Sequence, residues 1–187
     1  MDYVFDGYYS RNDYDRLYND DNVSFRSLVK EDYYYIKANA NYSMAFSHRN
    51  RLTFSLYEFM RISDSEYIGT SAYNQNLHSS ETILFADYSQ RLGSFFFDIN
   101  PGLSFLTYRL EGMKPINHLT PRLQARATYR IDKVQQLQFM FALGNTYPRI
   151  NTINNVEQQI DPFIILKGNP NMDNSILLNP RLSHTLN

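Results

Sequence analysis

The sequence contains no cysteine and no tryptophan, and it has only seven glycines and seven prolines among 187 residues. The lack of cysteine excludes disulfides and thiolate metal sites. No run of 18 apolar residues occurs, so we expect no transmembrane helix. The first residues have neither a basic start nor an apolar core, so we expect no signal peptide. Because Lys and Arg (18) balance Asp and Glu (19), the net charge gives no argument for nucleic-acid binding.

Motifs of catalysis and cofactor binding are missing as well. The glycines form neither a phosphate-binding loop nor a nucleophile elbow, and no two histidines have a metal-binding spacing. The four histidines stand alone, which favours solvated surface positions: His48, His78, His118 and His184. We therefore expect no enzymatic activity, no cofactor, and no catalytic or metal-binding residues.

An acidic segment near the amino terminus leaves one alternative open. Asp13, Asp15, Asp20 and Asp21 could bind a hard cation such as calcium through their carboxylate oxygens. The segment lacks the glycine and the final glutamate of an EF-hand loop. An exposed acidic loop over Arg11–Asn22 is the simpler interpretation.

Aromatic residues are abundant, with 16 tyrosines and 13 phenylalanines. Such residues favour pleated, half-buried surfaces and membrane interfaces. In Leu119–Ile131 the odd positions are apolar and the even positions polar, without a slip. Successive side chains of a strand point to opposite faces, so this segment predicts one strand with an apolar face and a strongly polar face. Its length exceeds the roughly 9–11 residues that a tilted strand needs to cross a bilayer.

The same alternation predicts further strands on both sides of this segment. In Arg51–Arg61 the pattern shifts after Leu56, which predicts either a bulge or an end of the pairing, and Pro101 with Gly102 predicts a bend or a bulge. We expect an all-β fold: an antiparallel up-and-down meander of long hairpins with about 6–8 strands over residues 1–187, forming part of a transmembrane β-barrel. The other predicted strands are Glu31–Phe46, Glu81–Leu92, Phe95–Arg109 and Val134–Asn145, with weaker patterns in Tyr3–Tyr9 and Ser175–Asn187.

The connections alternate between short and long. Short turns are expected at Ser47–Asn50, around Gly93 and at Ile131–Lys133. Long loops are expected at Ile62–Ser80, Leu110–His118 and Thr146–Asn174. Outer-membrane barrels have this asymmetry, with short periplasmic turns and longer extracellular loops.

Charged and amide side chains on the strands indicate which face would line the lumen. Placing Arg or Lys at the lipid midplane costs roughly 2–4 kcal/mol, so the polar faces are expected to point inward. A soluble sheet with one wet face would show the same alternation, and this alternative stays open. The predicted lumen-facing residues are Lys37, Asn39, Asn41, Arg122, Gln124, Arg126 and Arg130.

The segment from Leu119 to Pro170 carries a family resemblance. A strand, a tight turn and a second strand lead to a strand end at Thr146-Tyr147-Pro148-Arg149. An Ile160-Asp161-Pro162 element and then Gly168-Asn169-Pro170 follow. This order resembles the barrel region of TonB-dependent receptors of the Bacteroidota type. Tyr147 and Met172 depart from the residues usual there. We read Pro148, Gly168, Asn169 and Pro170 as structural: the glycine permits positive φ, and the proline fixes its own φ and holds Asn169 extended.

The resemblance implies part of an energised outer-membrane importer. In that family a barrel encloses a plug domain, and an inner-membrane TonB complex opens the path for a nutrient. This sequence shows neither a plug nor a TonB box, so we expect an internal barrel fragment. The expected partners are outer-membrane lipid and, in the whole protein, the plug, the TonB complex and in some members a surface lipoprotein. The substrate stays unknown. Weak candidates for ligand contact in the loop Ile62–Ser80 are Tyr67, Tyr73, Asn74 and Gln75.

Two other functions remain as alternatives. The chain could belong to a non-transporting outer-membrane barrel, such as an adhesin or an assembly factor. It could also be a soluble β-rich module that binds carbohydrate through its tyrosines.

Overall fold

The computed structural model describes residues 1–20, 23–68, 72–146, 150–153 and 157–186. Eight strands form one antiparallel sheet in which neighbours along the chain are neighbours in space, with β10 added beside β7. The predicted all-β meander of hairpins is therefore confirmed. The strands are β1 (Asp2–Asp20), β2 (Val23–Ser47), β3 (Asn50–Ile68), β4 (Tyr73–Leu92), β5 (Phe95–Leu110), β6 (Ile116–Arg130), β7 (Gln135–Thr146) and β10 (Ser175–Leu186).

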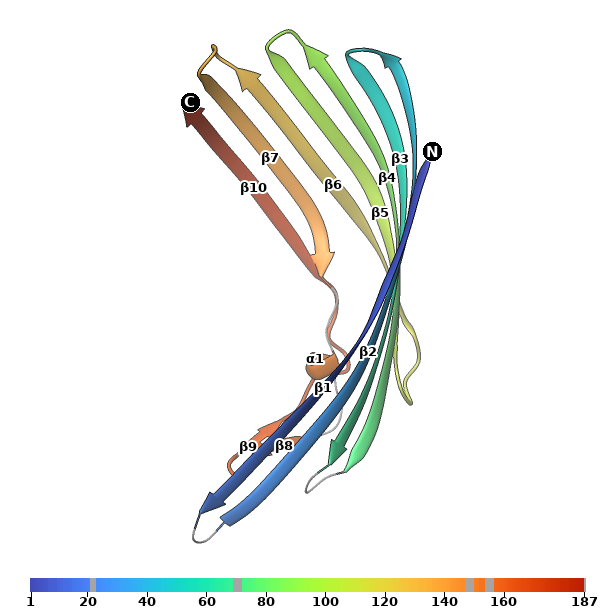
Figure 1. The fold of residues 1–187 in the computed structure, drawn as a ribbon, viewed down its shortest axis with the longest axis vertical. Coiled ribbons are helices and arrows are strands. Elements are labelled where there is room, and N and C mark those ends of the chain that lie inside the picture. The colour runs from blue at the N-terminus through green and yellow to red at the C-terminus, as the bar shows by residue number, and fades with distance from the viewer. Residues whose placement is uncertain (21–22, 69–71, 147–149, 154–156, 187) are drawn as a thin grey trace.

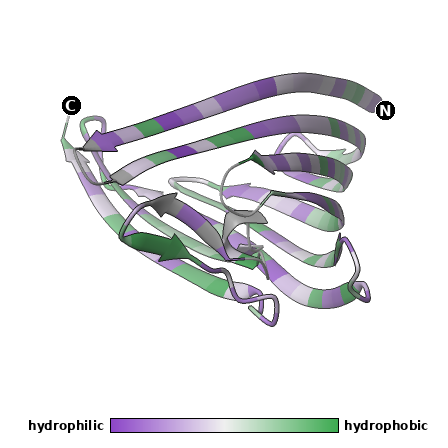
Figure 2. Ribbon diagram, turned by 90° about the horizontal axis from the view of Figure 1, so that it is seen from below, coloured by the Kyte–Doolittle hydropathy of each residue, from purple (hydrophilic) through white to green (hydrophobic). Residues whose placement is uncertain are grey.

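The sheet curls into a half-barrel with one concave and one convex face (Figure 1). Alternation along each strand separates the faces, as the banded colouring of the ribbons in Figure 2 indicates. Large apolar side chains remain exposed on the convex face, including Leu84 (54%), Leu103 (51%), Leu119 (69%) and Leu182 (69%). The described residues include no helix long and apolar enough to span a membrane.

Tight turns close the hairpins at one end of the sheet, which we call the turn end. Gly93 has a φ of 59° between β4 and β5, a conformation that glycine adopts without steric cost. At the β6–β7 turn, the Asp132 carboxylate accepts hydrogen bonds from the backbone N–H groups of Val134 and Gln135, both at 2.8 Å. The short turns predicted at these places are confirmed.

At the opposite, loop end, most of the predicted loops are wrong. β3 continues to Ile68 and β4 begins at Tyr73, so most of Ile62–Ser80 is paired strand. Likewise, β1 runs through the segment read as an acidic loop, and β5 and β6 shorten the loop predicted at Leu110–His118 to residues 111–115. Pairing uses backbone groups, so polar side chains do not end a strand when both neighbours continue.

The prediction of a bulge or an end of the pairing after Leu56 is also wrong. β3 pairs with β4 in a single register from Asn50 to Tyr67, and with β2 the only shift lies between Ala45 and Ser47. The change of pattern at Tyr57 and Phe59 occurs because these aromatics lie on the concave face. At Pro101–Gly102, pairing with β4 is interrupted at Pro101, yet the register is unchanged on either side.

The long connection between β7 and β10 folds back over the concave face at the loop end (Figure 1). It contains the short helix α1 (Ile150–Ile153) and a small hairpin of β8 (Gln158–Asp161) and β9 (Ile164–Leu166). Ile153, 1% exposed, packs in a cluster with Leu77, Leu106, Tyr108 and Leu110. This cluster is the apolar core that fixes the connection to the sheet.

Candidate functional site on the concave face

The pairing registers place the predicted lumen-facing residues on one face. Lys37 lies opposite Phe59, Phe59 opposite Glu81, Glu81 opposite Leu106, and Leu106 opposite His118. Leu106 touches Ile153 of the covering connection, so this row is concave. By the period of two, the same face carries Lys37, Asn39 and Asn41 of β2 and Arg122, Gln124, Arg126 and Arg130 of β6.

A buried charge cluster lies in the middle of this face. Arg122 Nη2 donates to Glu81 Oε1 at 2.5 Å, and Ser104 Oγ donates to the same oxygen at 2.7 Å. Arg61 Nη1 lies 4.0 Å from Glu81 Oε2. The Glu81 side chain is 5% exposed, and those of Arg61 and Arg122 are 12% and 17% exposed. A carboxylate this buried requires cationic and hydrogen-bonding partners, and the cluster supplies both.

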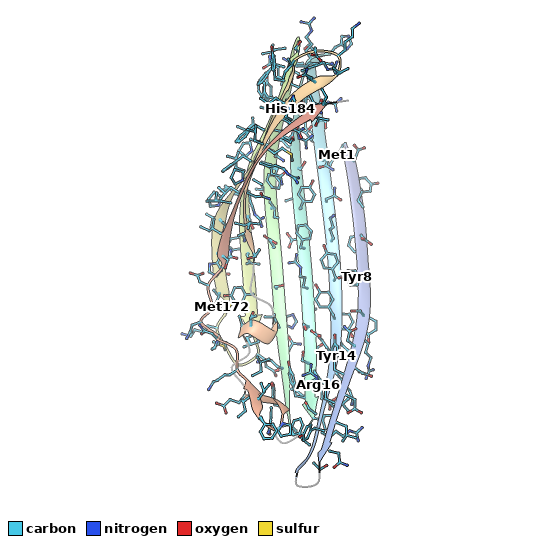
Figure 3. The ribbon with its side chains drawn as sticks, turned by 90° about the vertical axis from the view of Figure 1, so that its left-hand side faces the viewer. Met1, Tyr8, Tyr14, Arg16, Met172 and His184 are labelled. Carbon is cyan, nitrogen blue, oxygen red and sulfur yellow. The ribbon has the colours of Figure 1, made fainter. Side chains whose placement is uncertain are left out.

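An aromatic row crosses the concave face beside this cluster. Successive ring centroids are 5.1 Å apart from Tyr8 to Tyr35, 6.4 Å from Tyr35 to Phe59, 6.3 Å from Phe59 to Tyr57 and 6.2 Å from Tyr57 to Phe85. Arg61 Cζ lies 5.3 Å and Lys37 Nζ lies 5.8 Å from the ring centroid of Phe59. Figure 3 looks toward this face and shows Tyr8 on the edge strand β1. Rings with cations above them form a surface suited to stacking and cation–π contacts.

Two glycines make room for these side chains. A Cβ on Gly102 would clash with the ring of Phe85 and lie 2.5 Å from the carbonyl oxygen of Leu84. A Cβ on Gly144 would lie 3.1 Å from Nη1 of Arg122. The ring of Phe85 therefore covers bare backbone on β5, and the guanidinium of Arg122 has space beside β7.

The residues proposed as loop ligands lie on strands instead of in a loop. Tyr67 and Tyr73 stack with centroids 4.3 Å apart, and Tyr67 is 7% exposed. Gln75 is 5% exposed on the same concave face. Asn74 points to the opposite face, beside Glu66. Three of the four are brought together, but they are packed within the sheet and are not displayed at a loop tip.

The motif that carried the resemblance forms a turn, although not by the expected means. Gly93 and Gly112 are the positive-φ glycines of the described chain, so Gly168 does not use this freedom. Asn169 Oδ1 accepts from the backbone N–H of Asn171 at 3.0 Å, and the backbone N–H of Asn169 donates to Thr152 O at 2.8 Å. Pro170 is half-buried within this turn. Pro148 lies outside the described residues.

Residues 172–174, which follow this turn, contact side chains on the concave face of β5 and β6. Tyr108 Oη donates to Met172 O at 3.0 Å, and Asn174 Nδ2 donates to Thr120 Oγ1 at 3.4 Å. His118 Nδ1 lies 3.4 Å from Asp173. Burial and nearby Asp173 raise the pKa of Tyr108, which keeps the phenol protonated as a donor. The turn is thereby held against β5 and β6.

No metal site is formed within the described part of the chain. No group there of three or more His, Asp or Glu side chains is arranged to hold an ion. Asp15 is paired with Arg26, whose Nη2 donates at 2.8 Å, and Asp13 lies 3.6 Å from Arg11. Asp21 and the side chain of Asp20 lie outside the described residues, so the calcium alternative gains no support from the others.

Sequence reasoning missed the partners of Arg122. Glu81 and Arg61 were assigned only as strand ends, because both adjoin the stretch read as a loop. The available signal was a glutamate preceding an apolar strand, and an arginine that ends another strand on the side of Tyr57 and Phe59. Their meeting depends on registers that span three hairpins.

Comparison with known proteins identifies no relative. No family model matches the chain, and neither a curated protein nor a solved structure matches it significantly.

Proposed function

We propose that the chain forms part of the wall of an outer-membrane β-barrel, in a receptor of the TonB-dependent type that imports a nutrient. The observation that carries this proposal is the convex face, where long strands expose many large apolar side chains around one polar group of Glu58, Ser80 and Thr82. A soluble domain seldom exposes an apolar patch of more than a few hundred Å². Lipid removes that cost because the hydrocarbon solvates such side chains.

Strand length supports the same proposal. The strands of the large sheet have 12 to 25 residues. A membrane β-strand needs roughly 9–11 residues, and the excess of the longer strands would project beyond the bilayer at the loop end. Strands of soluble sheets are usually about 5–6 residues long.

The open edges support a larger barrel. β1 and β10 are each paired on one side only. Unpaired edges within lipid leave backbone donors and acceptors unsatisfied, so further strands of the same protein would close the barrel. The concave face would then line an interior that carries the Glu81–Arg122 cluster and the aromatic row.

The transporter reading rests on the resemblance in Leu119–Pro170, and two measurements test it. The protein carrying this chain should sediment with outer membranes and resist alkaline carbonate extraction. A photo-crosslinking group introduced at the turn end should capture TonB in energised cells. Release by carbonate would support the soluble-module alternative. Membrane retention without TonB capture, in a cell where a known receptor is captured, would support the non-transporting barrel.

A further inference from the structure

A second feature of the concave face lies at the turn end, away from the Glu81–Arg122 cluster. A hollow of about 640 Å³ is bounded by the turns that follow β2 and β4 and by β6 and β7. Its size falls within the roughly 300–1,000 Å³ of small-molecule pockets. Five arginines line it together with His48: Arg49, Arg51, Arg91, Arg126 and Arg130.

The charge of this hollow is offset only from its border, where Arg126 lies opposite Asp98 and interacts with Asp87. None of the five arginines forms an ion pair with a carboxylate of the described chain. No Asp or Glu lines the hollow, and the bordering carboxylates on the same face are Asp87 and Asp98. Elsewhere in the sheet, Arg122 and Arg26 each hold a carboxylate at 2.8 Å or less.

Arginines gathered from several strands repel one another, and a bound anion relieves that repulsion. Arg51 comes from β3, Arg91 from β4, and Arg126 and Arg130 from β6, so no local sequence pattern explains the grouping. Guanidinium groups present planar forks of N–H donors that match phosphate oxygens in pairs. Side chains that also line the hollow, Thr128, Gln136 and Gln138, add neutral hydrogen-bonding groups.

We propose that this hollow, which we call the arginine pocket, binds a small soluble anion carrying at least two phosphate-type charges. A lipid head group is the less suitable source, because the arginines line the concave side whereas the exposed apolar side chains are convex. The pocket is formed within one sheet, so the proposal goes beyond the transport proposal and can be tested without transport.

The test is calorimetric titration of the folded protein in neutral detergent with pyrophosphate at low ionic strength. We expect saturable one-site binding that weakens steeply as salt is added. The double variant Arg126→Gln/Arg130→Gln should weaken binding about tenfold or more, because charge-assisted hydrogen bonds are lost. Arg109→Gln is the matched control, since Arg109 is exposed at the loop end and does not line the hollow; its affinity should equal that of the wild type.

The conservative double variant Arg126→Lys/Arg130→Lys keeps the result interpretable if the glutamine variant does not fold. It retains the charge and loses the planar forks, so intermediate affinity is expected. Equal losses in the Arg109 control, or no saturable pyrophosphate binding, would overturn the proposal. Binding only in nanodiscs of anionic lipid would assign the pocket to a head group, and tighter binding of an oligoglutamate peptide would assign it to an acidic protein segment; either result also overturns it.

Discussion

Arg122 on β6 reaches across β5 to Glu81 on β4, and its Nη2 lies 2.5 Å from the carboxylate. Arg122→Met removes the closer of the two cations from a carboxylate that is 5% exposed. Breaking one partner of a buried ion pair costs about 3–5 kcal/mol, and we expect a loss near the lower bound because Arg61 remains. The measurement is unfolding by guanidinium in detergent.

The matched control is Arg109→Met, at an exposed position on the loop-end part of β5, with an expected change below about 0.5 kcal/mol. Glu81→Gln combined with Arg122→Met should cost less than the sum of the single changes, because each single change already breaks the same Glu81–Arg122 contact and the sum counts that loss twice. If the losses in the two single variants simply add up in the double variant, Glu81 and Arg122 contribute to stability independently of each other.

Gly102→Ala tests the contact between Phe85 and the bare backbone of β5. The added Cβ would meet the Phe85 ring and lie 2.5 Å from Leu84 O, so we expect destabilisation of about 1–3 kcal/mol. Adding Phe85→Leu should recover only part of the loss, since the carbonyl of Leu84 cannot move away. Full recovery, measured by the same unfolding experiment, would show that the ring alone makes glycine necessary.

Ile153→Ala tests how the covering connection is held. Ile153 is 1% exposed in the cluster with Leu106 and Tyr108. Truncating a buried isoleucine costs about 2–5 kcal/mol. We expect this loss to appear as faster proteolysis within residues 157–174 while the sheet keeps its unfolding midpoint. A lowered midpoint with unchanged proteolysis would mean that the connection and the sheet unfold together.

We expect the stabilisation of the β1–β2 hairpin by the Asp15–Arg26 pair at the loop end to depend on pH. Its hydrogen bond to Arg26 lowers the pKa of Asp15 below the ordinary value of 3.8. A lowered folded-state pKa means that the pair stabilises the β1–β2 hairpin above that value and loses its effect as the pH falls through the shifted pKa. Arg26→Gln should return the pKa of Asp15 toward 3.8, as followed by carbon NMR of labelled aspartate with Asp15→Asn for assignment. An unchanged titration would contradict the pairing.

Alternation was sufficient to predict the fold class and most of the sheet. Leu119–Ile131 falls on β6 almost in full, and its arginines share one face because the period of two is independent of neighbours. Alternation failed to predict strands in Ile62–Ser80. The buried residues there include Ser63, Ser65 and Gln75, whose polar side chains give no apolar alternation. The connection from β7 to β10 packs Ile153 against Leu77 of the same segment, and no local pattern encodes that contact.

The candidate site was predictable only in part, for the same reason. Arg126 and Arg130 were assigned to the correct face, but the arginine pocket also requires Arg51 and Arg91 from other hairpins. Pair registers set by the turns bring these residues together, and a one-residue error in any turn would exchange the faces.

If the chain forms a membrane barrel wall as we propose, the convex face contacts lipid and the concave face does not. The chain has no cysteine, so single cysteines can be introduced along β6 from Leu119 to Arg130 and spin-labelled in reconstituted bilayers. We expect the accessibility to alternate: oxygen reaches the odd positions such as Leu123 and Ala125, and a water-soluble nickel reagent reaches the even positions such as Gln124. Equal access of the nickel reagent to odd and even positions would contradict it.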